Sequence, residues 1–178
     1  MRALRRLLLP VLVVLSATYA WVRMAPPPQP VVEGPAPARA SHVVIHKSER
    51  LLTLFAGDRA FRTYRIALGG APSGAKRQEG DGRTPEGRYH IDAANPRSAY
   101  HLSLRISYPD RKDRAAAASR SVAPGGDIMI HGLPNGYGAI GIAHRLVDWT
   151  NGCIALTNGE MDEIWRLVPV GTPVEILP

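Results

Sequence analysis

The residues best suited to chemistry are Cys153, the only cysteine in the chain, and His131, which precedes it by 22 residues. Gly152 stands directly before the cysteine and allows a sharp turn that leaves backbone N–H groups free to face an oxyanion. Only a small part of an ordinary thiol is ionised at neutral pH, so the cysteine needs a partner that takes its proton. His131 follows the apolar run Ile128–Ile130, and a histidine held at a strand end suits that task. The pattern predicts nucleophilic catalysis by a Cys–His pair.

The same residues also fit alternatives. A lone cysteine is most often a small buried hydrophobic residue, and a histidine at a strand end is more often structural than catalytic. A metal-dependent hydrolase could use His131, His144 and Asp148, but the chain has no ligand pattern such as His-Glu-x-x-His. A single cysteine excludes an intramolecular disulfide and every zinc site with two or more thiolates. We expect neither a metal nor an organic cofactor.

The composition narrows the function classes. A chain of 178 residues with 45% hydrophobic content can form one folded domain and is too apolar to be disordered. Aromatic residues make up 6%, too few for a platform on which single-stranded nucleic acid stacks. The net charge of +7 is not arranged in a basic, aromatic stripe, so we expect no nucleic-acid partner. A mildly basic monomer fits an anionic cell surface instead.

The first 24 residues have the pattern of an export segment. Three arginines precede the apolar stretch Leu7–Val22, as in a signal peptide. This stretch has 16 residues, fewer than the roughly 20 that span a bilayer comfortably, and its cleavage pattern at Thr18–Ala20 is weak. We expect residues 1–24 to be a cleaved signal peptide or an uncleaved membrane anchor. Either would direct the following domain to the periplasm.

Residues 25–41 have the composition of a proline-rich linker. Six prolines fall between positions 25 and 40. Such a sequence favours extended polyproline II at about 3.1 Å per residue. We expect a semi-rigid spacer between the export segment and a folded domain at 42–178.

The domain at 42–178 has the pattern of a mostly β fold. Short β-branched or alternating runs predict strands at 42–46, 51–55, 61–68, 88–92, 100–106, 127–130 and 174–177. Residues 70–87 are rich in glycine and proline and predict a long loop. One helix is predicted after Thr157, which can form a capping box with Glu160 ahead of an apolar helical period. We expect a β-rich sandwich or barrel-like sheet with one C-terminal helix, preceded by an N-terminal apolar export helix.

Several short motifs occur in an order that resembles a known family. They are Gly-Asp-Gly-Arg-Thr-Pro-Glu-Gly at 80–87, Ser-Tyr-Pro at 107–109, Ile-x-Ile-His-Gly at 128–132, Gly-Ala-Ile-Gly at 138–141 and Thr-x-Gly-Cys at 150–153. Together they resemble the L,D-transpeptidase (YkuD-like) catalytic domain family over residues 42–177. The resemblance implies a β-rich sandwich of that type, with the cysteine and the histidine in a cleft.

The resemblance also assigns roles to individual residues. Cys153 takes the place of the nucleophile, and His131 takes that of the histidine that accepts and donates the proton. Gly132 matches the position whose carbonyl orients the histidine ring. The backbone amides of Gly152 and Cys153 match the oxyanion donors. Thr150 takes the Ser/Thr place of the motif, where we expect its hydroxyl to shape the loop.

The chain departs from the usual motif at two positions. Asn151 stands where the family usually has a histidine, and Ala155 stands where it usually has an arginine. The chain therefore resembles a side branch of the family with Gly-Cys-x-Ala. The charge that would hold a substrate carboxylate could come from Arg83 or from Arg145 instead.

The interval between His131 and Cys153 is also longer than the family's usual one. We expect an extra segment, near 143–149, to lie beside the site. His144 on this segment is a rival base, and we expect it on the surface.

These features imply an exported thiol enzyme that acts on the peptide stems of peptidoglycan through a thioester on Cys153. An amine acceptor would make the enzyme an L,D-transpeptidase. Water as the acceptor would make it a carboxypeptidase or amidase-type hydrolase that uses the same pair. An alternative from another class is a non-catalytic module that binds the cell wall. The expected partners are peptidoglycan stems and, where the N-terminal segment is retained, a membrane.

Overall fold

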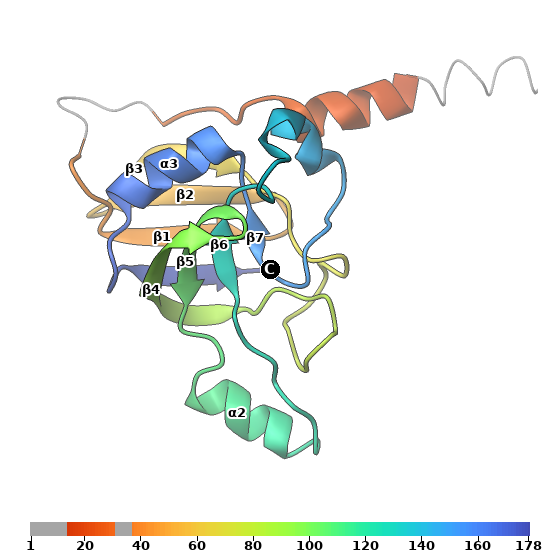
Figure 1. Cartoon of the computed structure of the whole chain (residues 1–178), viewed down its shortest axis with the longest axis vertical. Coiled ribbons are helices and arrows are strands. Elements are labelled where there is room, and N and C mark those ends of the chain that lie inside the picture. The colour runs from red at the N-terminus through yellow and green to blue at the C-terminus, as the bar shows by residue number, and fades with distance from the viewer. Residues whose placement is uncertain (1–13, 31–36) are drawn as a thin grey trace, which may run out of the picture.

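The computed structural model describes residues 14–30 and 37–178, and its centre is one eight-stranded sheet (Figure 1). The strands lie side by side in the order β3-β2-β1-β8-β4-β5-β6-β7. The pairs β1–β8 and β6–β7 are parallel, and the other neighbours are antiparallel. Their bounds are β1 His42–His46, β2 Leu51–Ala56, β3 Arg59–Arg65, β4 Gly87–Ser98, β5 His101–Ile106, β6 Met129–His131, β7 Ile154–Ala155 and β8 Pro173–Leu177.

The longest strand, β4, curls the sheet. Its first four residues, 87–90, pair with β8, whereas residues from Ile91 onward pair with β5. Two register shifts interrupt the second part, and bulges of this kind bend a strand and increase its twist. Pro96 lies in one of them, where a residue without an N–H is tolerated. The prediction of a mostly β fold is confirmed, but the sandwich is instead one curled sheet, because β4 hydrogen-bonds to both halves.

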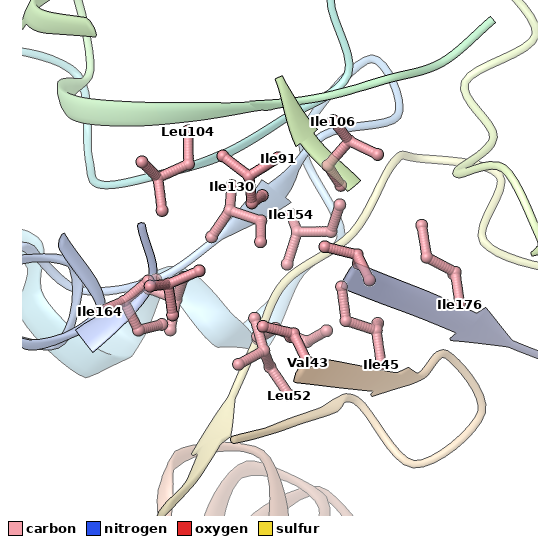
Figure 2. Close-up of a cluster of buried hydrophobic side chains, with 14 of the residues drawn as sticks. Val43, Ile45, Leu52, Ile91, Leu104, Ile106, Ile130, Ile154, Ile164 and Ile176 are labelled. Atoms are coloured by element: carbon pink, nitrogen blue, oxygen red, sulfur yellow. The ribbon is translucent and has the colours of Figure 1, made fainter. Parts of the chain in front are cut away.

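Apolar side chains from both halves of the sheet meet in one core (Figure 2). Successive residues of a strand point to opposite faces, so every second residue of these strands can point inward. Each large aliphatic side chain removed from water contributes about 1.5–3 kcal/mol. The labelled members are Val43, Ile45, Leu52, Ile91, Leu104, Ile106, Ile130, Ile154, Ile164 and Ile176.

The predicted C-terminal helix is confirmed as α3, Asn158–Leu167, which begins at the Thr157–Glu160 capping box. Two further helical segments were not predicted. They are α2, Arg111–Ala118, and the 3-10 segment η1, Gly138–Leu146. The start of α2 carries its own capping box, from Asp110 to Asp113. The segment η1 is kinked and has no capping signal.

Residues 14–24 form a helix that lies beside η1 (Figure 1). The hydroxyl of Tyr19 donates to the Leu146 carbonyl at 3.4 Å, and Nε of Arg23 donates to the Arg145 carbonyl at 2.6 Å. Within the described residues, no helix is both long enough and apolar enough to cross a membrane. Residues 1–13 of the predicted export segment lie outside the described residues.

The described start of the proline-rich segment lies along the edge strand β3. The side-chain amide of Gln29 donates to the Thr63 carbonyl at 2.7 Å and accepts from the Thr63 N–H at 3.1 Å. One side chain thus supplies both hydrogen bonds that a neighbouring strand would make. Residues 31–36 of the predicted linker lie outside the described residues.

Candidate active site

The pleat of β6 and β7 places His131 and Cys153 on the same face of the sheet. The two strands pair in parallel with Ile130 beside Ile154, and both isoleucines point into the core (Figure 2). Because side chains alternate between faces, the neighbouring His131 and Cys153 point away from the core. Both line one cavity of about 360 Å³. The two residues that the sequence singled out therefore line the same cavity.

The ring of His131 is fixed in one orientation. Its Nδ1 lies 2.6 Å from the carbonyl oxygen of Gly132, so a neutral ring donates from Nδ1 and keeps its lone pair on Nε2. The ring of Tyr100 packs against it at 4.7 Å between centroids, and that of Trp149 meets it edge-on at 5.8 Å. Burial lowers the pKa of His131, which favours the neutral ring. The arrangement suits a general base.

The thiol of Cys153 donates to the backbone carbonyl of Asp127 over 3.5 Å. Burial raises the pKa of the thiol, and the Asp127 carboxylate adds to the rise, while the N–H of Met129 opposes it. The pKa of His131 is lowered at the same time, so the resting pair is a neutral thiol and a neutral imidazole.

The cysteine loop is shaped by Thr150. Its hydroxyl donates to the Cys153 carbonyl at 2.8 Å and accepts from the Gly152 N–H at 3.1 Å. The N–H of Gly152 therefore already has a partner within the loop. This arrangement differs from the expected pair of oxyanion donors and leaves the N–H of Cys153 as the candidate donor.

The two arginines predicted to bind substrate lie elsewhere. Arg145 is buried, with 3% of its side chain exposed, and forms an ion pair with Glu160 at 2.5 Å. The prediction that Arg145 holds a substrate carboxylate is wrong, because its guanidinium is occupied and out of reach. Arg83 approaches the site through its backbone, which packs on Gly152, while its guanidinium lies near Gly74. Neither arginine lines the cavity.

His144 is not on the surface, as the sequence suggested, but buried behind Trp149. Its Nδ1 accepts a hydrogen bond from the indole Nε1 at 3.4 Å. Burial, with the charge of Arg145 next to it, lowers the pKa of His144 to about 4. The hydrogen bond and the lowered pKa fit a neutral ring that orients the indole of Trp149.

Asp148, the third residue of the metal alternative, is also occupied. Its carboxylate accepts from Arg50 at 2.7 Å, from Arg23 at 3.3 Å and from the Leu68 N–H at 2.9 Å. These contacts lower the pKa of Asp148, although burial works in the opposite direction. The carboxylate thus ties the loop before the cysteine to the first strands.

The cavity itself is aromatic and weakly polar. Its described lining contains no lysine or arginine, and Asp127 is its one carboxylate. Asn151 is exposed at the rim, whereas Ala155 is fully buried and pairs with Ala67. The lining residues are Asn95, Ser98, Ala99, Tyr100, Ser103, Asp127, Met129, His131, Trp149, Thr150, Asn151 and Cys153. The sequence analysis missed Tyr100, Trp149 and Asp127 as site residues, since no motif marks them.

Two buried lysines fix the long glycine-rich loop under the site. Nζ of Lys47 donates to the carbonyls of Gly74 and Thr84 and forms an ion pair with Glu86 at 2.7 Å. Nζ of Lys76 pairs with Asp81 at 2.9 Å. The loop therefore forms a firm support for the cysteine loop.

Comparisons with known proteins show the family to which the chain is similar. Residues 40–176 match the family model of the L,D-transpeptidase catalytic domain, YkuD. Over 133 residues the chain is 30% identical to "Putative L,D-transpeptidase YafK" of Escherichia coli (strain K12), covering 71% of this chain and 46% of that protein. The chain thus spans about half the length of the curated relatives it matches.

Solved structures share the fold. The helical cell shape determining protein Pgp2 of Campylobacter jejuni, in a mutant form, superimposes with a TM-score of 0.60 at 25% identity, covering 83% of this chain and 50% of that chain. Bd1075 of Bdellovibrio bacteriovorus gives a TM-score of 0.54 at 22% identity, covering 84% of this chain and 51% of that chain, a likeness of fold alone. With a family model that matches nearly the whole folded part, the chain belongs to the L,D-transpeptidase YkuD catalytic domain family.

Proposed function

We propose that the protein is a cysteine-dependent L,D-transpeptidase that acts on peptidoglycan peptide stems outside the cytoplasm. The family acts on peptidoglycan peptides. The observation that carries the proposal is the placement of Cys153 and His131 in one cavity, with Nδ1 of the histidine tied to Gly132 and Nε2 left available. No metal or organic cofactor enters the proposed reaction.

In the first half of the reaction, Sγ of Cys153 attacks the carbonyl carbon of an L,D bond in the stem, at a diaminopimelate-type residue. The thiol proton passes to Nε2 of His131, and the N–H of Cys153 supports the oxyanion. The C–N bond then breaks, and His131 returns the proton to the amine of the departing D-amino acid. A thioester on Cys153 remains.

In the second half, an acceptor attacks the thioester and gives a proton to His131. The C–S bond breaks, and the sulfur regains its proton. An amine acceptor yields a new peptide bond, whereas water yields a shortened stem. Hydrolysis is the second candidate function, because the described lining of the cavity offers no lysine or arginine that would hold the carboxylate of an acceptor peptide.

The test is incubation of the purified protein with defined muropeptides, followed by mass analysis of the products. Cys153→Ala should abolish turnover while the protein stays folded, and Cys153→Ser should be strongly impaired. The matched control, His90→Ala on an exposed position of β4, should keep full activity. Turnover by Cys153→Ala would overturn the thioester mechanism. An inert wild-type protein that still binds muropeptides would favour the wall-binding module.

A further inference from the structure

The segment η1 is packed with its polar residues inward. Its two buried residues are His144 and Arg145, whereas Ile140 and Ile142 are 47% and 50% exposed. A surface helix normally buries its apolar side chains and exposes its polar ones, because apolar burial stabilises the fold. The two isoleucines contribute little to the core, so their outward position points to a contact beyond the domain.

The apolar exposure extends well past these two residues. Tyr137 and Val147, on either side of η1, are 61% and 62% exposed, and with Ile140 they line a groove of about 340 Å³. The helix at 14–24, hydrogen-bonded to η1, carries further exposed apolar side chains: Val14, Leu15, Tyr19, Trp21 and Val22. We call these exposed side chains of η1, its two flanks and the helix the apolar face.

The segments that form the apolar face contain no acidic residues of their own. The sequence has no aspartate or glutamate from Ile128 to Val147, and none before Glu33. The nearest carboxylate in sequence, Asp148, is held by Arg50 and Arg23. Tyrosine and tryptophan, which the face presents at three positions, are the residues enriched where a protein meets the surface of a bilayer. A lipid surface favours apolar contact with few acidic groups. The face offers this contact, and Glu49 lines a cavity with its members Tyr19 and Val22.

We propose that the apolar face lies against a lipid bilayer. The sequence before the helix favours a bilayer as the partner of this face, since Leu7–Val13 continues the apolar run and three arginines precede it. Apolar segments flanked by arginine bind the surface of anionic membranes. The sequence before the helix at 14–24 is suited to bind a membrane. Because this helix lies beside η1, it would place η1 at the same membrane.

The contact has a consequence for the candidate active site. Trp149 forms a wall of the groove on the apolar face and also a wall of the catalytic cavity. A membrane on one side of this indole holds the cavity close to the membrane surface, where it reaches the peptide stems nearest to the bilayer. This inference goes beyond the proposed function, and its test does not depend on catalysis.

The test places a fluorescent probe on the face of the full-length chain. In a Cys153→Ala background, Ile142→Cys and Val170→Cys each carry the only thiol and are labelled with nitrobenzoxadiazole. Val170 is the matched control, because it is an apolar residue that is 55% exposed, about as much as Ile142. It follows the end of α3, whereas the opposite end of that helix, at Asn158, contacts the loop before η1. The proteins are bound to vesicles of phosphatidylethanolamine and phosphatidylglycerol that contain a nitroxide-labelled lipid.

We expect the probe at 142 to be quenched several-fold more strongly by the nitroxide lipid than the probe at 170. Equal quenching at both positions would overturn the proposal. So would a Trp21→Cys probe that is quenched while the 142 probe is not, because the helix would then bind lipid without η1. Shielding of the 142 probe that requires no lipid and rises with protein concentration would identify a second copy as the occupant and would likewise overturn it.

Discussion

The Cα of Gly152 lies so close to the carbonyl oxygen of Arg83 that a Cβ on the glycine would overlap that oxygen. The same glycine has a φ of +122°, a conformation that L side chains rarely adopt. The cysteine loop and the glycine-rich loop beneath it are therefore in direct backbone contact. The position of the sulfur depends on this contact, because Cys153 is the next residue.

Gly152→Ala should both destabilise the protein and inactivate it. The overlap is with backbone, which cannot rotate away, so we expect a loss of about 2–4 kcal/mol in the free energy of unfolding. Activity should fall further than the unfolded fraction explains. Urea unfolding and muropeptide turnover check the two effects. Gly57→Ala is the control, since its φ is +59° with nothing within 4 Å, and it should cost only about 1 kcal/mol with full activity. Equal behaviour of the two variants would contradict the role of the contact.

The pH profile should show that His131 works as a neutral base. Burial lowers its pKa below the ordinary value of about 6.5, so kcat/KM should fall only as the pH drops below that value. A rate that keeps rising well above neutral pH would instead indicate that thiolate must form first. His131→Ala should lower the rate by about 10² to 10⁴-fold, and His144→Ala should lower it weakly. The reverse ranking would make His144 the base.

His144 should make the protein sensitive to acid. Its pKa is lowered to about 4 in the fold, mainly by burial, against about 6.5 for a free histidine. The unfolded chain therefore takes up a proton first, and stability that is complete above pH 6.5 is lost as the pH falls toward 4. The effect is at most about 3 kcal/mol. His144→Asn keeps an acceptor for Trp149 without titrating, so its free energy of unfolding should fall less between pH 7 and pH 4.5. Parallel losses in both proteins would refute this.

Sequence periodicity predicted the strands that alternate between core and solvent. The run His42–His46 matches β1 at both ends, and α3 begins at the predicted capping box. The prediction for β4 stopped at Asp92, six residues early, because its remainder has no large apolar or β-branched side chain and contains a proline that a bulge accommodates. The helix α2 was missed although its capping residues are visible in the sequence.

The candidate site was only partly accessible to sequence reasoning. Cys153 and His131 stand in motifs, and the paired strands β6 and β7 place both along one cavity. Tyr100 and Trp149 come from distant segments, and nothing local to either residue shows that it packs on His131. The sequence also did not show that η1 exposes its isoleucines and buries His144 and Arg145, because a buried segment can have the same composition. These contacts and exposures depend on packing between segments that are far apart in the sequence, and no local pattern in a single sequence shows that packing.

Asp127 should restrain the reactivity of the thiol. Burial is the main cause of the raised pKa of Cys153, and the Asp127 carboxylate adds to it. Asp127→Asn removes the charge, and asparagine also tolerates the φ of 53° found there. We expect iodoacetamide to alkylate Cys153 about two- to threefold faster at pH 7, where a full pKa unit would give tenfold. Asp58→Asn, in the turn between β2 and β3, is the control and should leave the rate unchanged. A slower reaction in Asp127→Asn would reverse the sign of this argument.

The balance between water and an amine as acceptors of the thioester should depend on how firmly the amine is held. An acceptor wins only when it is held in place beside the thioester, and orientation of this kind is worth several kcal/mol of barrier. Ala155 is buried and offers no charge, the guanidinium of Arg145 belongs to Glu160, and Asn151 at the rim cannot share a proton. We therefore expect trimmed muropeptides to form beside the cross-linked dimers from tetrapeptide-stem substrate at saturating acceptor. Asn151→His restores the usual residue of the motif and should raise the share of dimer, whereas Asn95→His, which adds the same ring elsewhere in the cavity, should not. A wild-type product that consists of dimer alone would show that the acceptor is held by groups other than these.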